Sequence, residues 1–339
     1  MNNNPHLSSK RILSGMRVTG KLHLGHYHGV LKNWVELQHQ YQCFFFAADI
    51  HALTTHFAHP KEIKSNLREM LIDWLSCGVD PNAAVLFVQS HIPETAELHL
   101  LLSMITPLGW LERVPSYKDQ QENLKDKDLS TYGFLGYPLL QSADILLYKA
   151  QMVPIGEDQL SHIEITREIA RRFNYLYGEQ GKKIILPEPQ ALLTKTAKLS
   201  GLDGRKMSKS YHNTIGLRED PDSITKKIRT MPTDPARIKR SDAGDPEKCP
   251  VWPLHKVYGD DNLKSWVQKG CTTAGIGCIE CKQALIDNVV KETKPILEKS
   301  KEFENNSDTI NNILKNGEEK AREVAQKTIN EVKQVMGLI

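Results

Sequence analysis

The chain has 339 residues, enough for two domains that each bury a core of their own. Its 44 basic and 41 acidic residues give a net charge of +3, so no overall basic field marks it as a nucleic-acid-binding protein, and any such contact must depend on local patches. The polar residues 1–5 carry no apolar leader, and no stretch approaches about 18 consecutive apolar residues, so we expect a cytosolic protein.

The first two hundred residues alternate between strand and helix patterns. Short apolar runs predict strands and three-and-four spacing predicts helices, in the order strand 11–13, helix 24–35, strand 43–49, helix 63–75 and strand 84–88. A glycine-punctuated loop at 14–20 follows the first strand, and Gly78 suits the end of the second helix. This order predicts an α/β fold, a doubly wound and Rossmann-like parallel sheet over residues 1–215, with ligands at the carboxyl edge of its strands.

The rest of the chain favours helices. The segment from Leu98 to Leu111 predicts an inserted helix, within a helical insertion near residues 94–135. Strand patterns become rare after Ser210, where several prolines interrupt the chain, and an amphipathic pattern resumes from Asp308 to Met336. We therefore expect a mainly helical second domain over residues 216–339, whose last helix packs back on the first domain.

Two histidines open the first predicted helix. His23 and His26 in His23-Leu24-Gly25-His26 are three positions apart and project from the same side of a helix. They follow a strand and a glycine-rich loop, an arrangement that presents backbone N–H groups to phosphate. The imidazoles could donate to an α-phosphate as charge develops on it, which is catalysis by preorganised donors. The alternative for an isolated pair of this kind is an exposed, histidine-rich helix end.

Two lysines stand in a second motif, Lys206-Met207-Ser208-Lys209-Ser210. Gly201 and Gly204 precede it and indicate a loop. Lys206 and Lys209, with Mg²⁺, suit the β- and γ-phosphates of a nucleoside triphosphate, since nucleotidyl transfer depends mainly on positioning and charge neutralisation. We expect this loop to be mobile, because pyrophosphate must leave. The alternative for a generic pair of lysines is a solvated basic turn.

The two motifs together, in this order, resemble the paired signatures of class I aminoacyl-tRNA synthetases. The resemblance implies an enzyme that activates an amino acid with ATP and Mg²⁺ and then loads it onto tRNA. It also favours phosphate binding over the exposed helix end and the solvated basic turn, because each motif is the expected partner of the other.

The middle of the chain carries the candidate amino-acid site. Tyr137, Gln141 and Asp144 share one helical face by their spacing of four and three. A carboxylate among apolar neighbours needs a donor, and either an indole N–H or a phenol hydroxyl would serve. A turn at Val153–Gln159 then brings Asp158 and Gln159, which suit an ammonium group and a ribose. The alternative is a core helix whose polar side chains are satisfied within the protein.

Several stretches resemble the bacterial tryptophanyl-tRNA synthetase family over nearly the whole chain, among them 14–20, 109–113, 153–159 and 336–338. The resemblance implies that Asp144 accepts the indole N–H, that Tyr137 and Gln159 hold the α-ammonium, and that His51 lies near the tryptophan. It also implies an ATP site made of Arg17, Val18, Thr19, Gly25, His26, Gly156, Glu157, Asp158, Lys206, Met207, Ser208, Lys209 and Ser210. Its implied partners are L-tryptophan, a tryptophan-specific tRNA and a second copy of the chain.

Two positions depart from the family pattern and keep alternatives open. Many members carry Gln where this chain has Arg17, and Met where it has Gln141. Arg17 adds a cation near the triphosphate or the substrate carboxylate, while Gln141 is found in tyrosine-specific relatives. A tyrosyl-tRNA synthetase therefore remains the second interpretation, and a catalytically silent paralogue the third.

Four cysteines in the helical domain form a candidate metal site. Cys249, Cys271, Cys278 and Cys281 are separated by twenty-one, six and two residues, whereas Cys43 and Cys77 lie in apolar settings. Disulfides are unexpected in a cytosolic enzyme, which leaves packed thiols, Zn²⁺ or an iron–sulfur cluster. The spacing resembles a subgroup of tryptophanyl-tRNA synthetases with a [4Fe–4S] cluster, although the first gap is one residue short. We expect such a cluster near the anticodon-binding region, with Zn²⁺ as the alternative.

Overall fold

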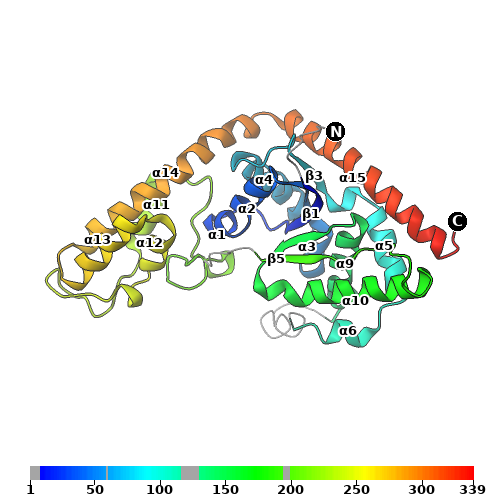
Figure 1. Cartoon of the computed structure of the whole chain (residues 1–339). Coiled ribbons are helices and arrows are strands. Elements are labelled where there is room, and N and C mark those ends of the chain that lie inside the picture. The colour runs from blue at the N-terminus through cyan, green and yellow to red at the C-terminus, as the bar shows by residue number, and fades with distance from the viewer. Residues whose placement is uncertain (1–7, 59, 116–129, 194–198) are drawn as a thin grey trace.

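The computed structural model describes residues 8–58, 60–115, 130–193 and 199–339. Its centre is a sheet of five parallel strands in the order β3-β2-β1-β4-β5 (Figure 1). The strands are β1 (Ser8–Arg17), β2 (Tyr41–Ala48), β3 (Ala84–Val88), β4 (Met152–Ile155) and β5 (Gln190–Leu193). The chain builds outward from β1 to β3 and then crosses back to add β4 and β5 on the other side of β1. The predicted doubly wound sheet is thus confirmed, and its reversal between β1 and β4 is where open α/β sheets bind ligands.

Three consecutive phenylalanines in β2 explain why the sheet is covered on both faces. Phe45 points into one core, where it stacks on Trp34 with ring centroids 4.3 Å apart. Phe44 and Phe46 point into the second core, because successive side chains of a strand face opposite sides. An apolar run without alternation is therefore what a strand between two helical layers requires.

Helices cover both faces of the sheet. After β5, the named elements of the described residues are all helices. Around the sheet lie α1 (Leu24–His26), α2 (Lys32–Leu37), α3 (Asp49–His56), α4 (Lys61–Ser76), α5 (Glu94–Ser103), α6 (Leu108–Glu112), α8 (Tyr132–Leu135), α9 (Tyr137–Leu147) and α10 (Leu160–Tyr177). The C-terminal region contains α11 (Pro221–Thr230), α12 (Trp252–Tyr258), α13 (Asp261–Thr272), α14 (Cys278–Glu304) and α15 (Ser307–Val335).

Two predicted helices differ in detail from the structure. The helix expected over 24–35 contains a π-helical turn, Tyr27–Leu31, between α1 and α2, a feature that is often found at functional sites. The single helix expected from Leu98 to Leu111 is wrong, because α5 ends at Ser103 and α6 begins at Leu108. Pro107 between them has an extended backbone and disfavours a helical residue before it.

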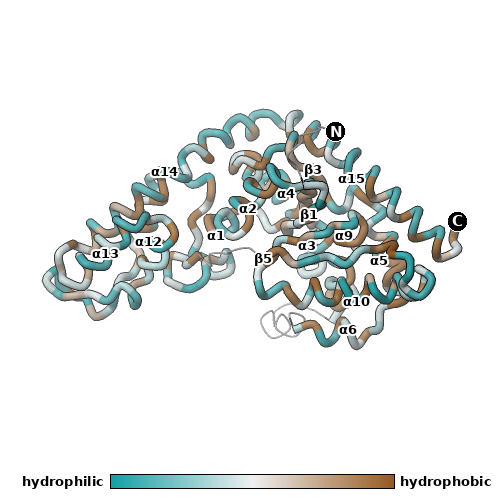
Figure 2. The backbone as a smooth tube through the Cα atoms, in the orientation of Figure 1, coloured by the Kyte–Doolittle hydropathy of each residue, from teal (hydrophilic) through white to brown (hydrophobic). Residues whose placement is uncertain are grey.

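The last helix lies against the edge strand β3. A Cβ at Gly317 of α15 would come within 1.8 Å of the Leu86 carbonyl oxygen, so only glycine permits this approach. Farther along α15, Ala325 and Ile329 enter the same core as Phe87. Figure 1 shows α14 leading away from the α11–α13 region and α15 continuing past the β3 side of the sheet, beside α5. Many residues along both long helices are hydrophilic (Figure 2), as expected of helices with one buried stripe.

Candidate active site

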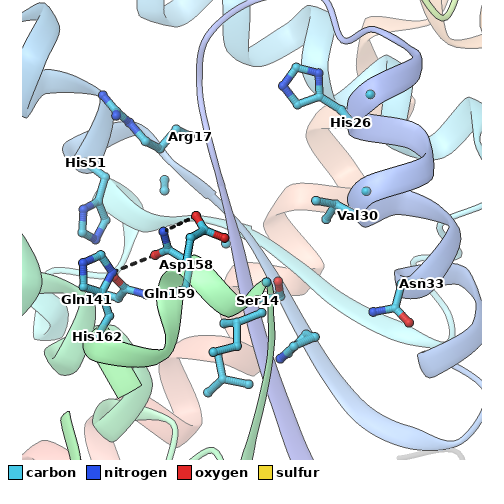
Figure 3. Close-up of a pocket in the computed structure, with 18 of the residues that line it drawn as sticks. Ser14, Arg17, His26, Val30, Asn33, His51, Gln141, Asp158, Gln159 and His162 are labelled. Carbon is cyan, nitrogen blue, oxygen red and sulfur yellow. Dashed lines mark hydrogen bonds between the residues drawn. The ribbon is translucent and has the colours of Figure 1, made fainter. Parts of the chain in front are cut away.

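A cavity of about 1310 Å³ lies at the carboxyl ends of β1 and β4. In Figure 3, His26 and Asn33 face it from the α1–α2 segment, while His51, Gln141, Gln159 and His162 lie on the opposite side. Most of the residues predicted for the site line it: Arg17, His23, Gly25, His26, His51, Tyr137, Gln141, Asp144, Gly156, Glu157, Asp158, Gln159, Lys206, Met207, Ser208 and Ser210.

The three other predicted site residues lie beside the cavity. Val18 is buried in the core, with 3% of its surface exposed. Lys209 donates from Nζ to the carbonyl oxygen of Thr19 at 2.6 Å, so these two residues tie the second motif to the loop after β1. The structure thus brings all the predicted nucleotide-site residues to one region of the sheet edge.

His23 and His26 are held as neutral donors. The Nδ1 atom of His23 accepts from the Gly25 backbone N–H at 3.1 Å, and the Nδ1 atom of His26 accepts from the His23 backbone N–H at 3.3 Å. Both rings must therefore carry their proton on Nε2. Burial, followed by the Lys209 and Lys206 charges, lowers the pKa of His23 to about 4. Burial, His23 and the same lysines lower the pKa of His26 to about 3, so both imidazoles are uncharged at neutral pH.

Gly25 is required by the close packing of the first motif. A Cβ on this residue would lie 2.9 Å from the His23 ring, tighter than real contacts allow. The two histidine rings are themselves only 3.9 Å apart between centroids. A side chain at this position would displace the ring that caps the helix.

Asn213 organises the second motif. Its Oδ1 accepts from the Ser208 backbone N–H at 2.8 Å, and its Nδ2 donates to Asp203 Oδ1 at 2.7 Å and to the Lys206 carbonyl oxygen at 3.2 Å. This buried carboxamide fixes the backbone between the two lysines. Sequence reasoning missed it, because an asparagine in a loop has no periodic signal.

The chain beyond the second motif returns to the first. The Leu24 N–H donates to the Ile215 carbonyl at 3.0 Å, and the Leu217 N–H donates to the Leu22 carbonyl at 3.1 Å. The buried Asp73 carboxylate also accepts from the Leu22 N–H at 2.7 Å. Backbone pairing thus closes the distance of about 180 positions that separates the motifs in sequence.

Asp144 is a buried carboxylate on the wall of the cavity, with 2% of its surface exposed. His51 Nε2 lies 3.0 Å from its Oδ2, and Gln89 Nε2 donates to Oδ1 at 2.9 Å and to Oδ2 at 2.8 Å. The pKa of Asp144 is raised on balance, because its burial outweighs the bonds from His51 and Gln89, which lower it. These bonds stabilise the carboxylate form, which can accept one more N–H or O–H from a ligand.

A hydrogen-bonded row of side chains continues from Tyr137. Its hydroxyl lies 3.0 Å from His162 Nε2, His162 Nδ1 lies 2.7 Å from Gln159 Oε1, and Gln159 Nε2 donates to Asp158 Oδ2 at 3.1 Å (Figure 3). Burial is the main cause that lowers the pKa of His162 to about 4, so the ring is neutral. A neutral His162 that donates to Gln159 must accept from Tyr137, so the Tyr137 hydroxyl is the donor of this pair.

Arg17 lines the cavity near His51, on the side opposite His26 (Figure 3). Its guanidinium donates to the Thr55 hydroxyl, and burial lowers its pKa. The arginine that departs from the family pattern therefore has a fixed partner and faces the cavity.

The four C-terminal cysteines come together at a second, smaller cavity of about 20 Å³. Cys249, Cys271, Cys278 and Cys281 all line it, together with Thr233, Arg237, Val251, Ile276 and Lys282. A guanidinium nitrogen of Arg237 lies 3.8 Å from Cys271 Sγ, and His255 Nε2 lies 3.3 Å from Cys281 Sγ. Within the described ranges, no three His, Cys, Asp or Glu side chains are placed to hold a metal ion.

The C-terminal helices α12 and α14 contact the segment that carries His26 directly. The Tyr258 hydroxyl of α12 lies 2.8 Å from His28 Nε2, two residues beyond His26. Glu292 of α14 is 2.9 Å from His28 Nε2 and 2.6 Å from Lys32 Nζ. Through these polar side chains, α12 and α14 contact the π-helical turn and the start of α2.

None of the helices in the described residues is long and apolar enough to cross a membrane.

Comparisons with known proteins agree with this geometry. Residues 7–335 match the family of class I tRNA synthetases (W and Y). A tryptophan–tRNA ligase of Ralstonia nicotianae is 53% identical over 394 residues, covering 97% of this chain and 98% of that protein, and one of Thermotoga maritima is 52% identical over 331 residues, covering 97% and 99%. The tryptophanyl-tRNA synthetase of Campylobacter jejuni, solved with ADP and tryptophan, has a TM-score of 0.86 and 35% identity, covering 97% of this chain and 100% of that one. With both motifs at one cavity of a doubly wound sheet, the chain belongs to the class I tRNA synthetases of the tryptophan and tyrosine family.

Proposed function

We propose that this chain is a tryptophan–tRNA ligase. It activates L-tryptophan with ATP to tryptophanyl-adenylate, releases pyrophosphate, and transfers tryptophan to the 3′ end of its tRNA. The observation that carries the proposal is the buried Asp144 carboxylate in the same cavity as the two nucleotide motifs. The tryptophan–tRNA ligases that match nearly the full chain support the same substrate.

The nucleotide occupies the side of the cavity formed by the two motifs. Nε2–H of His23 and His26 donates to the α-phosphate, where negative charge grows in the transition state. Lys206 and Lys209, with Mg²⁺, neutralise the β- and γ-phosphates. Val18, Thr19 and Gly156–Asp158 complete this side. The reaction needs no covalent intermediate on the enzyme.

The amino acid occupies the opposite side. Asp144 accepts the indole N–H, and Tyr137 and Gln159 bind the α-ammonium through oxygen acceptors. His51 and Gln141 border the ring, and Arg17 is close enough to the amino-acid side to bind the substrate carboxylate. Since a phenol hydroxyl could also donate to Asp144, tyrosine is the competing substrate that an experiment must exclude.

Pyrophosphate–ATP exchange measured with tryptophan and tyrosine in parallel tests this function. Tryptophan should support exchange, whereas tyrosine should support very little, because its shorter ring places the hydroxyl differently from an indole N–H. Exchange with tyrosine alone would assign the chain to the tyrosine branch. Nucleotide or tRNA binding without exchange for either amino acid would show a catalytically silent paralogue.

The helical region supplies the tRNA contacts in this proposal. Residues 1–215 form the catalytic domain, with the insertion near 94–135, and residues 216–339 form the anticodon-binding domain. The enzyme acts in the cytoplasm as a homodimer, with tRNA bridging the subunits. Apolar side chains that are more than half exposed on and beside α5, α6 and α8 support a dimer surface there: Leu100, Met104, Leu108 and Tyr132.

The four C-terminal cysteines hold a [4Fe–4S] cluster in this proposal. The proposal rests on the donor set alone, since four thiols line one cavity and thiolates are the usual ligands of such clusters, whereas the described side chains are not placed to hold a metal ion. Arg237 and Lys282 at the same cavity would offset the negative charge of four bound thiolates. The cluster would fix irregular backbone for anticodon contact. Zn²⁺ bound by the same four thiols is the alternative.

Metal analysis of anaerobically purified protein tests the centre. We expect brown protein with about four irons per chain, since each iron of the cluster takes one cysteine ligand. Cys278→Ser should lose most of the iron and impair tRNA charging far more than tryptophan-dependent exchange. Cys77→Ser, outside the cluster of cysteines, is the matched control and should retain its iron. Colourless protein with one zinc per chain would decide for the alternative.

A further inference from the structure

Behind Asp144 lies a glutamine to which the motifs of this chain assign no role. Gln89 is fully buried, with no exposed surface, and belongs to the helical turn Gln89–His91 that follows β3. It lies 55 positions from Asp144 in sequence, yet its carboxamide contacts both carboxylate oxygens. The cavity is lined by Asp144, with Gln89 placed behind it.

The orientation of this carboxamide is fixed by a second bond. The backbone N–H of His51 donates to Gln89 Oε1 at 3.3 Å, so the amide nitrogen must face Asp144. The His51 side chain contacts the same carboxylate, at Oδ2. His51, Gln89 and Asp144 therefore form a closed ring of hydrogen bonds built from three different elements.

The ring is anchored outside the cavity as well. Asp49, at the start of α3, accepts from the Ser90 backbone N–H at 3.0 Å and from the Ser90 hydroxyl at 2.5 Å. These bonds hold the turn that carries Gln89 against the helix that carries His51. Both donors to Asp144 thus sit on segments that cannot shift independently, which is how an acceptor is preorganised.

The two carboxylate oxygens are not equivalent. Oδ2 has contacts from both His51 and Gln89, whereas Oδ1 accepts from Gln89. A carboxylate oxygen can accept about two hydrogen bonds, so Oδ1 has the larger remaining capacity for a ligand donor.

We propose that Gln89 is a specificity-determining positioning residue, which holds the Asp144 carboxylate so that Oδ1 is presented to a ring N–H of the amino-acid substrate. This inference rests on the proposed tryptophan activation. It predicts that Gln89 contributes to the enzyme's preference for rings that carry this N–H, and much less to the binding of the rest of the amino acid or of ATP. Without Gln89 the carboxylate loses a charge-assisted donor to each oxygen and can rotate or become protonated, and either change weakens it as an acceptor.

The test compares tryptophan with the analogue in which sulfur replaces the indole N–H, in the full-length Gln89→Met variant. Methionine has similar length and volume but no donor. We expect kcat/KM for tryptophan in pyrophosphate–ATP exchange to fall about 10- to 100-fold, the usual effect of losing a hydrogen bond to a charged group. The analogue should lose less than about threefold, because it never used the acceptor, and the KM for ATP should stay within about twofold of its original value.

A matched control separates this role from a purely structural one. Gln38 is another buried glutamine, whose carboxamide donates to the Gly78 carbonyl at 3.0 Å and accepts from the Asp80 N–H at 2.9 Å, away from the cavity. Gln38→Met should lower thermal stability without changing the ratio of kcat/KM for tryptophan to kcat/KM for the analogue. If Gln89→Met does not yield folded protein, Gln89→Leu also removes the donor, and it should lower the kcat/KM for tryptophan relative to that for the analogue at least as much.

The possible outcomes separate a failure of the positioning role from a failure of the proposed function. Equal losses for tryptophan and the analogue in the Gln89 variants would overturn the positioning role while leaving tryptophan activation intact. An original enzyme that shows no tryptophan-dependent exchange would instead contradict the proposed function itself. A ratio of kcat/KM for tryptophan to kcat/KM for the analogue that falls only in the Gln89 variants supports the proposal.

Discussion

A tryptophan analogue with sulfur in place of the indole N–H should be activated about 10⁴- to 10⁵-fold less efficiently than tryptophan, the range seen when a buried hydrogen-bonding site meets a substrate that lacks the matching group. Asp144 is buried, and its burial already raises its pKa, so a further unpaired contact with an apolar ring is costly. The analogue fills the same volume and removes only the donor. The comparison therefore isolates a single hydrogen bond.

The measurement is kcat/KM for exchange with each compound. A ring-fluorinated tryptophan that keeps its N–H is the control, and it should remain a good substrate because the fluorine does not alter the donor. Comparable use of the sulfur analogue would remove Asp144 from the role of indole acceptor and, with it, the basis on which Gln89 is proposed to act.

Replacing His26 with alanine should slow adenylate formation about 10²- to 10³-fold, with little change in the Michaelis constants, because a donor to developing charge contributes mainly in the transition state. The structure supports this direction, since the backbone bond to Nδ1 fixes the proton of His26 on Nε2. Pre-steady-state measurement of activation would give the rate directly. His26→Gln, which keeps an N–H at similar reach, should recover part of the lost rate.

The low pKa values of His23 and His26 also predict how the rate of activation depends on pH. A lowered pKa keeps an imidazole neutral at every pH above it, and the values for His23 and His26 are about 4 and about 3. Activation should therefore show no titration of these histidines between about pH 6 and 8, and their protonation should matter only well below this range. An inflection near pH 6.5 that disappears in His26→Ala would contradict the neutral-donor role.

The local sequence was sufficient for the elements that depend on pattern alone. The apolar runs of β2 and β3 and the amphipathic repeat of α15 require burial whatever their neighbours are, so their approximate bounds could be read from the chain. The break in the helix at Pro107 is not evident from the sequence pattern, because apolar residues keep helical spacing on both sides of it. The tendency of proline to end a helix opposes that pattern.

The residues of the site likewise fall into those that the sequence indicates and those that only the structure places. The sequence by itself determined the two motifs that we propose bind phosphate and the carboxylate of Asp144, because exact residue strings and an acidic residue among apolar neighbours are local signals. Only the tertiary structure decided which side chains hold them: Asn213 between the two lysines, His162 beside Tyr137 and Gln89 behind Asp144. These are polar residues without periodic spacing, and the bonds of His162 and Gln89 cross 25 and 55 positions. A buried hydrogen bond is fixed by the meeting of separate elements, and that meeting exists only once the sheet has folded.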